Sequence, residues 1–226
     1  MALLFGAVGD PHGDFDALDR VMARHPEVAF WLCPGDLASE SGEYPRPRAP
    51  LYWIKGNNED FDFVASQPVG AGTIANLLYI PNGIPVQAPG LMLAGLGGTL
   101  APTWYHRPAS ELRPLSPRDD RRRHFVHEEV KACKALGGID VFLSHEAPRP
   151  FPLAGVKDAG KTPINEVLAS MRPRLHLFGH HHKYGVAERQ HVVSIGLEQV
   201  SDSYVLFDGK TLAHERLRSP GSQGGS

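Results

Sequence analysis

Five short apolar segments of the chain each end abruptly in a cluster of glycine and polar residues. Segments of this length are typical of buried β-strands, whereas helices need longer runs with a 3.6-residue period. The five segments lie at residues 3–9, 29–33, 51–55, 139–143 and 175–178. Because ligands of open α/β sheets bind beyond the strand ends, the polar clusters are expected to meet at one edge of a sheet. The alternation of strand, polar loop and helix predicts an α/β fold.

Apolar residues at helical spacing predict three helices, at residues 15–25, 118–136 and 164–171. Residues 77–98 carry brief apolar runs separated by Pro-Asn-Gly and Ala-Pro-Gly turns, which predict a β-meander. The polar, proline-rich residues 103–117 are expected to form a long loop. Three further strands are expected near residues 185–187, 191–195 and 203–207.

The 226-residue chain carries no internal repeat and no segment that resembles an interdomain linker. We therefore expect one domain over residues 1–218, followed by a disordered Gly/Ser-rich tail at residues 219–226. The apolar share of 42% and the charged share of 21% are those of a soluble globular protein.

Charge and cysteine content exclude several classes of protein. The net charge of −2 gives no support for nucleic-acid or membrane binding through overall charge, although a local basic patch is compatible with it. Cys33 and Cys133 do not form a CxxC pair, so a reducing compartment is expected. The N-terminus lacks the basic segment of a signal peptide, and no apolar run approaches the roughly 20 residues that span a bilayer. A cytoplasmic location without a membrane partner is the expectation.

The polar clusters contain carboxylate, amide and imidazole groups, all of which bind divalent cations. The candidate metal ligands are Asp10, His12, Asp36, Asn57, His145, His180 and His182. Each cluster alone is common by chance in solvated loops, but all of them follow a predicted strand and can therefore converge. A ligand set without thiolates suits Mn²⁺, Fe or Zn²⁺ at a catalytic site better than a structural zinc site.

In this order, the clusters resemble the motifs of the calcineurin-like metallophosphoesterase superfamily. The residues that carry the resemblance are Asp10-x-His12, Gly35-Asp36, Gly56-Asn57-Asn58-Glu59, His145 and Gly179-His180-x-His182. The resemblance extends over most of the chain. It implies a sandwich of two mixed sheets flanked by helices, with two divalent metal ions at the strand ends.

The resemblance also implies how the ligands are shared between the two ions. One ion is assigned to Asp10, His12, Asp36 and His182, and the other to Asp36, Asn57, His145 and His180, with Asp36 bridging them. Two ions roughly 3.5–4 Å apart clamp a phosphate and lower the pKa of a bridging water towards ~7. Mn²⁺ is the favoured metal, with Fe or Zn²⁺ as alternatives. The implied reaction is hydrolysis of a phosphate ester by in-line attack of a metal-bridging hydroxide.

The middle of the chain is similar to the RNA lariat debranching enzymes and their prokaryotic relatives, within the same superfamily. The similarity lies at residues 76–80, 93–99 and 139–148. Debranching enzymes cleave a 2′,5′-phosphodiester, so the resemblance implies a phosphodiesterase for nucleotide or nucleic-acid-like substrates, with RNA as one candidate. Those enzymes typically carry Cys where this chain has Asp10, which restores the general ligand of the superfamily.

A second departure affects acid catalysis. The superfamily motif normally supplies a His that contacts the phosphate and protonates the leaving group, and this chain has Asn58 there. Asn donates a hydrogen bond but no proton, and general acid catalysis typically contributes about 10²–10⁴-fold. His106 on the long loop and His181 between two ligands are the candidate replacements. His106 is favoured because a mobile loop could carry it over the metals, although each residue is also compatible with an exposed bystander. A good leaving group or a low activity would also explain Asn58.

Three further features have both a functional and a structural interpretation. Arg118 and the run at residues 121–123 would steer a polyanionic substrate, or form the solvated face of a helix. Trp104 and Tyr105 would stack on a nucleobase, or pack the loop against the domain. Glu59 is expected to support the site from behind the ligands or to cap a helix.

Two other functions remain open from the sequence. The nearest is a phosphomonoesterase or nucleotide pyrophosphatase, whose site would close around a terminal phosphate. The other is a metal-binding or scaffold protein that has lost catalysis through the change at Asn58.

Overall fold

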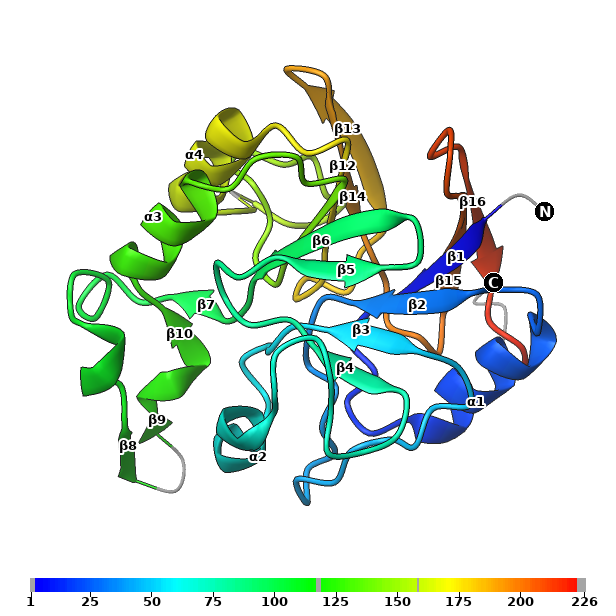
Figure 1. Cartoon of the computed structure of the whole chain (residues 1–226), viewed down its shortest axis with the longest axis horizontal. Helices are drawn as coiled ribbons and strands as arrows, with labels where there is room; N and C mark the ends of the chain where they lie inside the picture. The colour runs from blue at the N-terminus through cyan, green and yellow to red at the C-terminus, as the bar shows by residue number, and fades with distance from the viewer. Residues whose placement is uncertain (1–2, 117–118, 158, 223–226) are drawn as a thin grey trace.

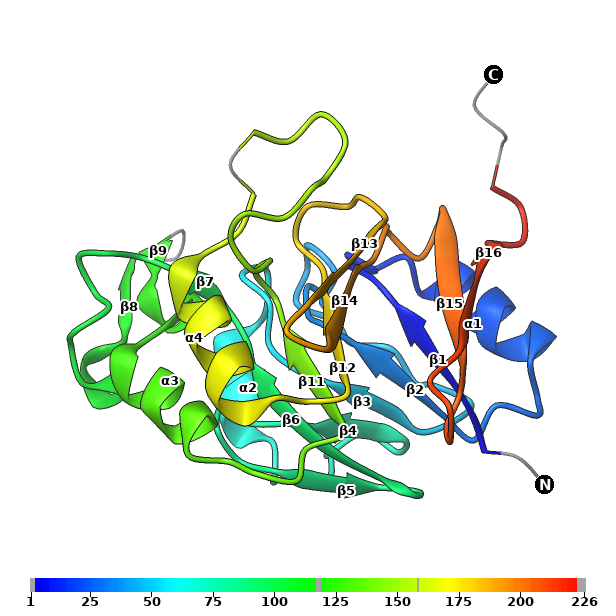
Figure 2. The ribbon, with the colours of Figure 1, turned by 90° about the horizontal axis from the view of Figure 1, so that it is seen from above.

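The computed structural model describes residues 3–116, 119–157 and 159–222. Two six-stranded sheets lie face to face, with helices on their outer sides (Figures 1 and 2). The main apolar core lies between the sheets and takes side chains from both, including Phe5 and Leu32 from one and Leu143 and Leu177 from the other. The predicted α/β fold with a two-sheet sandwich flanked by helices is confirmed.

The first sheet contains the strands that were expected nearest the N-terminus. Its order is β16 (His214–Arg218), β15 (Ser203–Asp208), β1 (Leu4–Val8), β2 (Phe30–Cys33), β3 (Leu51–Trp53) and β4 (Leu77–Tyr79). Strands β1 to β4 are parallel, and β15 runs antiparallel to β1 and to β16. The carboxyl ends of β1, β2 and β3 therefore lie at the same edge of this sheet.

The second sheet is also mixed and has parallel strands at its centre. Its order is β13 (Gly185–Arg189), β14 (Val192–Gly196), β12 (Leu175–Phe178), β11 (Val141–Ser144), β6 (Leu91–Leu96) and β5 (Val86–Ala88). The four inner strands are parallel, and both edge strands are antiparallel to their neighbours. The ends of β11 and β12 therefore approach the ends of β1, β2 and β3 across the sandwich.

Within the described residues, four α-helices cover the outer faces of the sheets. They are α1 (Phe15–Arg24), α2 (Phe61–Ser66), α3 (His127–Lys134) and α4 (Thr162–Met171). Apolar side chains of α1 and α2 join the cluster on the outer face of the first sheet, and those of α3 and α4 join the cluster on the second. No helix in the described part of the chain has the length and apolar character needed to cross a membrane.

The helix predicted at residues 118–136 is wrong in its first half. Residues Asp119–Asp120 form β9, which pairs with β8 (Pro114–Ser116), and they are followed by a 3₁₀ turn at Arg121–Arg123 and by β10 (His124–Phe125) beside β7 (Thr99–Leu100). The Asp120 carboxylate accepts from the backbone N–H of Arg122, and the buried ammonium of Lys55 donates to the carbonyls of Arg122 and His124. These side chains take the backbone groups that an α-helix would pair, so α3 begins only at His127.

The predicted β-meander at residues 77–98 is also wrong, because the chain changes sheets there. Strand β4 completes the first sheet, while β5 and β6 form an antiparallel hairpin in the second. Within the loop expected at residues 103–117, a 3₁₀ turn occupies Ala109–Glu111, and β8 follows it. Helix α2 and strand β16 were not predicted. Of the expected tail, Ser219 is buried and donates to the Val200 carbonyl, and residues 223–226 lie outside the described part.

The contact between Gly6 and Trp31 tests the packing of the first sheet. Gly6 on β1 lies opposite Trp31 on β2, and a Cβ atom at Gly6 would lie 2.3 Å from the buried indole. We predict that Gly6→Ala lowers the free energy of unfolding by about 1–3 kcal/mol, because the indole cannot move away inside a packed layer. Urea unfolding measures the loss. Gly137→Ala is the matched control, since no heavy atom lies within 4 Å of its Cβ position; equal losses in the two variants would contradict the prediction.

Candidate metal centre

The backbone is strained at the positions of the proposed ligands. Non-glycine residues in the left-handed region of φ cost roughly 1–3 kcal/mol each and cluster at functional sites. Of the ten such residues in the described part of the chain, five are proposed ligands: Asp10 (φ 36°), His12 (φ 46°), Asp36 (φ 53°), His180 (φ 66°) and His182 (φ 52°). Apolar periodicity carries no information on φ, so this concentration of strain was not visible in the sequence.

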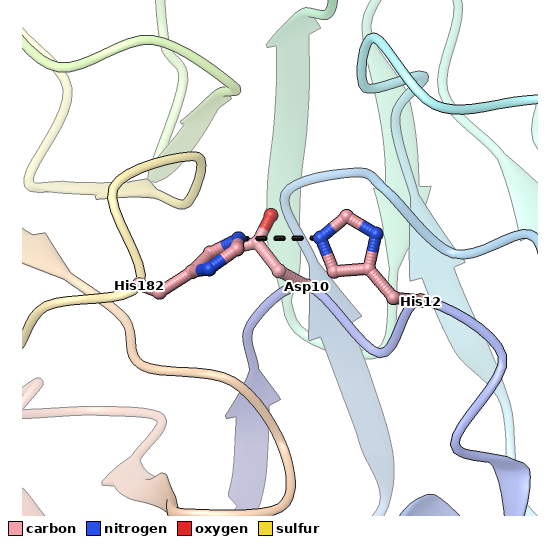
Figure 3. A group of neighbouring side chains, drawn as sticks. All are labelled: Asp10, His12 and His182. Carbon is pink, nitrogen blue, oxygen red and sulfur yellow. Dashed lines mark hydrogen bonds between the residues drawn. The ribbon is translucent and has the colours of Figure 1, made fainter.

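One ligand group joins the ends of β1 and β12. The Nε2 atoms of His12 and His182 lie 3.2 Å apart, and the Asp10 carboxylate lies beside them (Figure 3). Burial and the neighbouring His12 lower the pKa of His182, which favours the neutral ring that binds metals. Asp10 is fully buried, and its Oδ2 accepts from the backbone N–H of His180. Its Oδ1 has no hydrogen-bond partner among the described residues, which leaves this oxygen available to a cation.

The second ligand group contains Asp10, Asp36 and His145. The Nδ1 atom of His145 lies 2.9 Å from the Pro34 carbonyl and donates to it, which fixes the ring. Its Nε2 atom then faces Asn57 Oδ1 at 3.0 Å and Asp36 Oδ2 at 3.5 Å. Burial lowers the pKa of His145, but Asp36 and Asp10 outweigh that effect and the net pKa is raised. The protonated ring would place positive charge between the carboxylates, as a bound cation would.

Asp36 lies between the two groups. Its Oδ2 is 3.5 Å from His12 Nε2 in one group and 3.5 Å from His145 Nε2 in the other. Its Oδ1 accepts from the backbone N–H groups of Asn57 and Asn58, at 2.7 and 2.8 Å. Burial pushes the pKa of Asp36 up, but His145 and the hydrogen bonds from Asn58 outweigh it, so the net pKa is lowered. Asp36 is therefore held ionised in the position that a bridging carboxylate needs.

The charge balance of the site fits divalent cations. Asp10 and Asp36 are both buried, and among the described residues their ion pairs are all with histidines. Burial raises the pKa of Asp10 to about 7, which shows how poorly its charge is compensated by these neighbours. A donor set of imidazole nitrogens and carboxylate or amide oxygens is suited to Mn²⁺, Fe or Zn²⁺. The donor types therefore suit divalent cations, while the two groups share Asp10 instead of Asp36, so the assignment of ligands to two ions stays a prediction.

Three other predicted site residues, His180, His181 and His106, pack against neighbouring aromatic rings. The His180 ring packs against that of His145, with centroids 4.9 Å apart, and burial lowers its pKa to about 4. The His181 ring packs on His180, and its buried Nε2 has no hydrogen-bond partner in the described part of the chain. His106 is exposed and packs against the rings of Tyr105 and His127.

Asn58 and Glu59 organise the loop after β3. The Asn58 side-chain amide donates to Asp36 Oδ2 at 2.8 Å, so it approaches the proposed bridging carboxylate directly. The Glu59 carboxylate accepts from the backbone N–H groups of Leu37, Ala38 and Gly56, and from the Tyr44 hydroxyl. Glu59 thereby ties the loop after β2 to the loop after β3, which is the supporting role expected from the sequence.

The arginine run and the aromatic pair are engaged within the protein. The guanidinium of Arg121 lies over the Trp104 ring at 5.1 Å and pairs with Asp119. Arg122 pairs with Asp62 and Asp120. Arg118 lies outside the described residues.

A cleft of about 820 Å³ extends from the ligand cluster. His12, Asn57 and Asn58 line the part of the cleft at this cluster. Residues 38–42 and 59–62 line it further along, as do side chains of β8, β9 and the 3₁₀ turn at Arg121–Arg123. The sequence did not identify these walls, because they come from loops and from the segment that was predicted to be helical. Lys55, also missed, holds that segment in place through its two backbone carbonyl contacts.

Comparison with known proteins identifies the family. The sequence profile described as calcineurin-like phosphoesterase matches residues 3–184, which include the proposed ligands. The chain belongs to the calcineurin-like phosphoesterase family. It is 26% identical over 161 residues to the lariat debranching enzyme of Drosophila melanogaster, a match that covers 63% of this chain and 30% of that enzyme. The chain thus spans about a third of the length of such debranching enzymes.

Two other relatives match nearly end to end. An uncharacterized protein of Haemophilus influenzae is 24% identical over 219 residues, covering 86% of this chain and 92% of its own. The crystal structure of TT1561 of Thermus thermophilus has a TM-score of 0.65 at 14% identity, covering 96% of this chain and 99% of that chain. The structural likeness supports the fold and carries no information on the substrate.

Asp10→Asn tests the uncompensated charge of the site. Because the folded protein raises the pKa of Asp10 from 3.8 to about 7, the chelated wild type loses stability as pH rises through that interval. We predict that Asp10→Asn stabilises the chelated protein at pH 8 by about 1–3 kcal/mol, and by less at pH 5, since Asn keeps the acceptor for the His180 N–H without the charge.

Thermal unfolding of both proteins with EDTA and with Mn²⁺ measures these effects. The wild type should gain stability from Mn²⁺ and the variant should gain much less. Equal stabilisation of the two proteins by Mn²⁺ would exclude Asp10 as a ligand.

Proposed function

We propose that this chain is a two-metal phosphodiesterase that acts on nucleotide-like diesters, with Mn²⁺ as the favoured metal. The observation that carries the proposal is the pair of candidate ligand groups that share Asp10, with Asp36 between them, beside a large cleft that His12 and Asn57 line. Bound there, two divalent ions would polarise the phosphoryl group and supply a nucleophile from water at neutral pH. The fold brings the ligands from both sheets to one place.

The size of the cleft favours a substrate with a substituent on each side of the phosphate. Sites for small molecules typically enclose about 300–1,000 Å³, and the 820 Å³ here lies in the upper part of that range. A phosphoryl group at His12, Asn57 and Asn58 would occupy only a part of this volume. The remaining volume runs between residues 38–42 and the β8–β9 segment, which gives room for a nucleoside-sized group.

The charge of the walls favours a short substrate over a long polyanion. Arg122 is already paired with Asp62 and Asp120, and Glu40 and Asp60 also line the cleft. Tight binding of a nucleic-acid backbone normally requires several unpaired cationic side chains along the path of the phosphates. The similarity to lariat debranching enzymes keeps RNA as a candidate, but these walls favour a dinucleotide or a modified nucleotide.

The protein's own groups suggest how the reaction proceeds without the usual histidine. The Asn58 amide donates to Asp36 and lines the cleft, where it would stabilise negative charge on the phosphoryl oxygens of a substrate. His181 is the candidate acid that packs on the proposed ligand His180, and its buried Nε2 lacks a partner among the described residues. His106 packs against Tyr105 and His127 instead.

The proposal is tested with an activated aryl phosphodiester and the matching aryl phosphomonoester. We expect the Mn²⁺-loaded protein to hydrolyse the diester faster, and Asp36→Asn to reduce turnover by at least about 100-fold, because it weakens both metal positions. Asp19→Asn is the matched control, since Asp19 forms an exposed ion pair with Arg48. Turnover of the monoester alone would replace the proposal with a phosphomonoesterase. No turnover of either ester, with two ions bound by elemental analysis, would favour a binding protein.

The Asn58→His variant tests whether Asn58 impairs catalysis or is suited to the native substrate. If the leaving group needs a proton, the restored imidazole should raise kcat on an unactivated diester by about 10²-fold, with little change on the activated aryl diester. A fall in kcat on both substrates would instead show that the amide of Asn58 is suited to the native substrate. Steady-state kinetics at pH 7 on both substrates measures the difference.

A further inference from the structure

A chain of buried hydrogen bonds crosses the second sheet beneath the ligand cluster. Ser194 on β14, His176 on β12 and Ser144 on β11 are all buried. His176 Nδ1 lies 3.0 Å from the Ser194 hydroxyl, and His176 Nε2 lies 2.7 Å from the Ser144 hydroxyl. Ser144 also contacts the Glu146 carbonyl at 2.5 Å. His176 thus connects three parallel strands through side chains alone.

The donor and acceptor of each bond in this series of hydrogen bonds follow from the last acceptor, the Glu146 carbonyl. A carbonyl only accepts, so the single hydroxyl proton of Ser144 is donated to the Glu146 oxygen. The Ser144 oxygen must then accept from His176, which places a proton on Nε2. Burial lowers the pKa of His176 to about 3, so the ring is neutral and Nδ1 accepts from Ser194. All three donors point the same way, from β14 towards residue 146.

The last bond closes a tight turn around a proposed ligand. Ser144 and Glu146 flank His145, and the Ser144 hydroxyl joins the two ends of this three-residue segment. The remaining contacts of His145 include a backbone bond to Leu96 and the ring bond to the Pro34 carbonyl. The backbone on either side of His145 is therefore held by Ser144, and Ser144 is held by His176.

The surroundings of His176 argue against a role in filling space. Its ring stacks between Phe142 and Phe178, with centroids 5.5 and 5.6 Å away. A third phenyl ring would fill this position without the cost of burying two polar nitrogens. The imidazole supplies what a phenyl ring cannot, a fixed donor to Ser144.

We propose that His176 is a positioning residue that sets the orientation of His145 through Ser144 and the turn at residues 144–146. The inference rests on the proposed metal centre, because it assigns His145 as a ligand. Hydrogen-bond partners behind metal ligands typically change metal affinity or activity by about 10–100-fold when removed. Here the partner acts on the backbone of the ligand, and the ring itself is held by Pro34.

The test compares His176→Phe with a variant that weakens the same layer elsewhere. We expect His176→Phe to lower Mn²⁺ affinity by about tenfold and kcat by a similar factor, with KM for the aryl diester nearly unchanged. Val167→Ala is the control, because Val167 is fully buried in α4 and lies outside the hydrogen-bond chain. It should lower Tm while leaving Mn²⁺ affinity at the wild-type value. Equal Mn²⁺ affinities in the two variants would overturn the proposal.

Two further measurements do not depend on turnover or on the folding of His176→Phe. Long-range ¹H–¹⁵N spectra of the wild type should show the His176 proton on Nε2 from pH 5 to 8, and a proton on Nδ1 alone would overturn the chain. Ser194→Ala should lower Mn²⁺ affinity below the wild-type value, and an unchanged affinity together with the opposite tautomer would overturn the proposal. If the wild type binds Mn²⁺ but hydrolyses no ester, the proposed function fails, while these affinities still test the role of His176.

Discussion

Two buried carboxylates at the meeting point of the sheets are the constraint on which the rest of the site depends. Asp10 and Asp36 follow adjacent parallel strands, and each is forced into a left-handed backbone conformation. Burying like charges together is unfavourable unless hydrogen bonds, histidines or cations compensate them. The surrounding loops supply backbone donors to both carboxylates, and His145 lies between them. Burial of these two carboxylates therefore costs some folding stability and forms a site that favours positive charge.

The sandwich makes this concentration of charge possible. Parallel strands in both sheets deliver their carboxyl ends to one rim, while the apolar core between the sheets keeps the layers in register. Both sheets contribute proposed ligands: β1 to β3 are followed by both carboxylates, Asn57 and His12, and β11 and β12 are followed by the other three histidines. Neither sheet alone would form a complete group, so packing of the core is a precondition for the site.

The sequence predicted the parts that depend on local pattern. The five apolar segments, the fold class and the residues that converge at the rim followed from strand length and from the polar residues after each strand. It failed where side chains compete with the backbone, as at Asp120 and Lys55, which prevent the helix expected at residues 118–136. It also missed the cleft walls and the His176 chain, because both depend on contacts between residues distant in the sequence.

Lys55 links two segments that border the cleft. Its ammonium binds two carbonyls of the opposite wall, while its own backbone immediately precedes the loop that carries Asn57 and Asn58. The wall and the ligand loop are thus fastened to one side chain, and neither can swing outward without the other. The cleft wall and the loop with Asn57 and Asn58 would therefore open together. Their amide hydrogens would exchange with solvent at a common rate, which is set by the release of the Lys55 ammonium group.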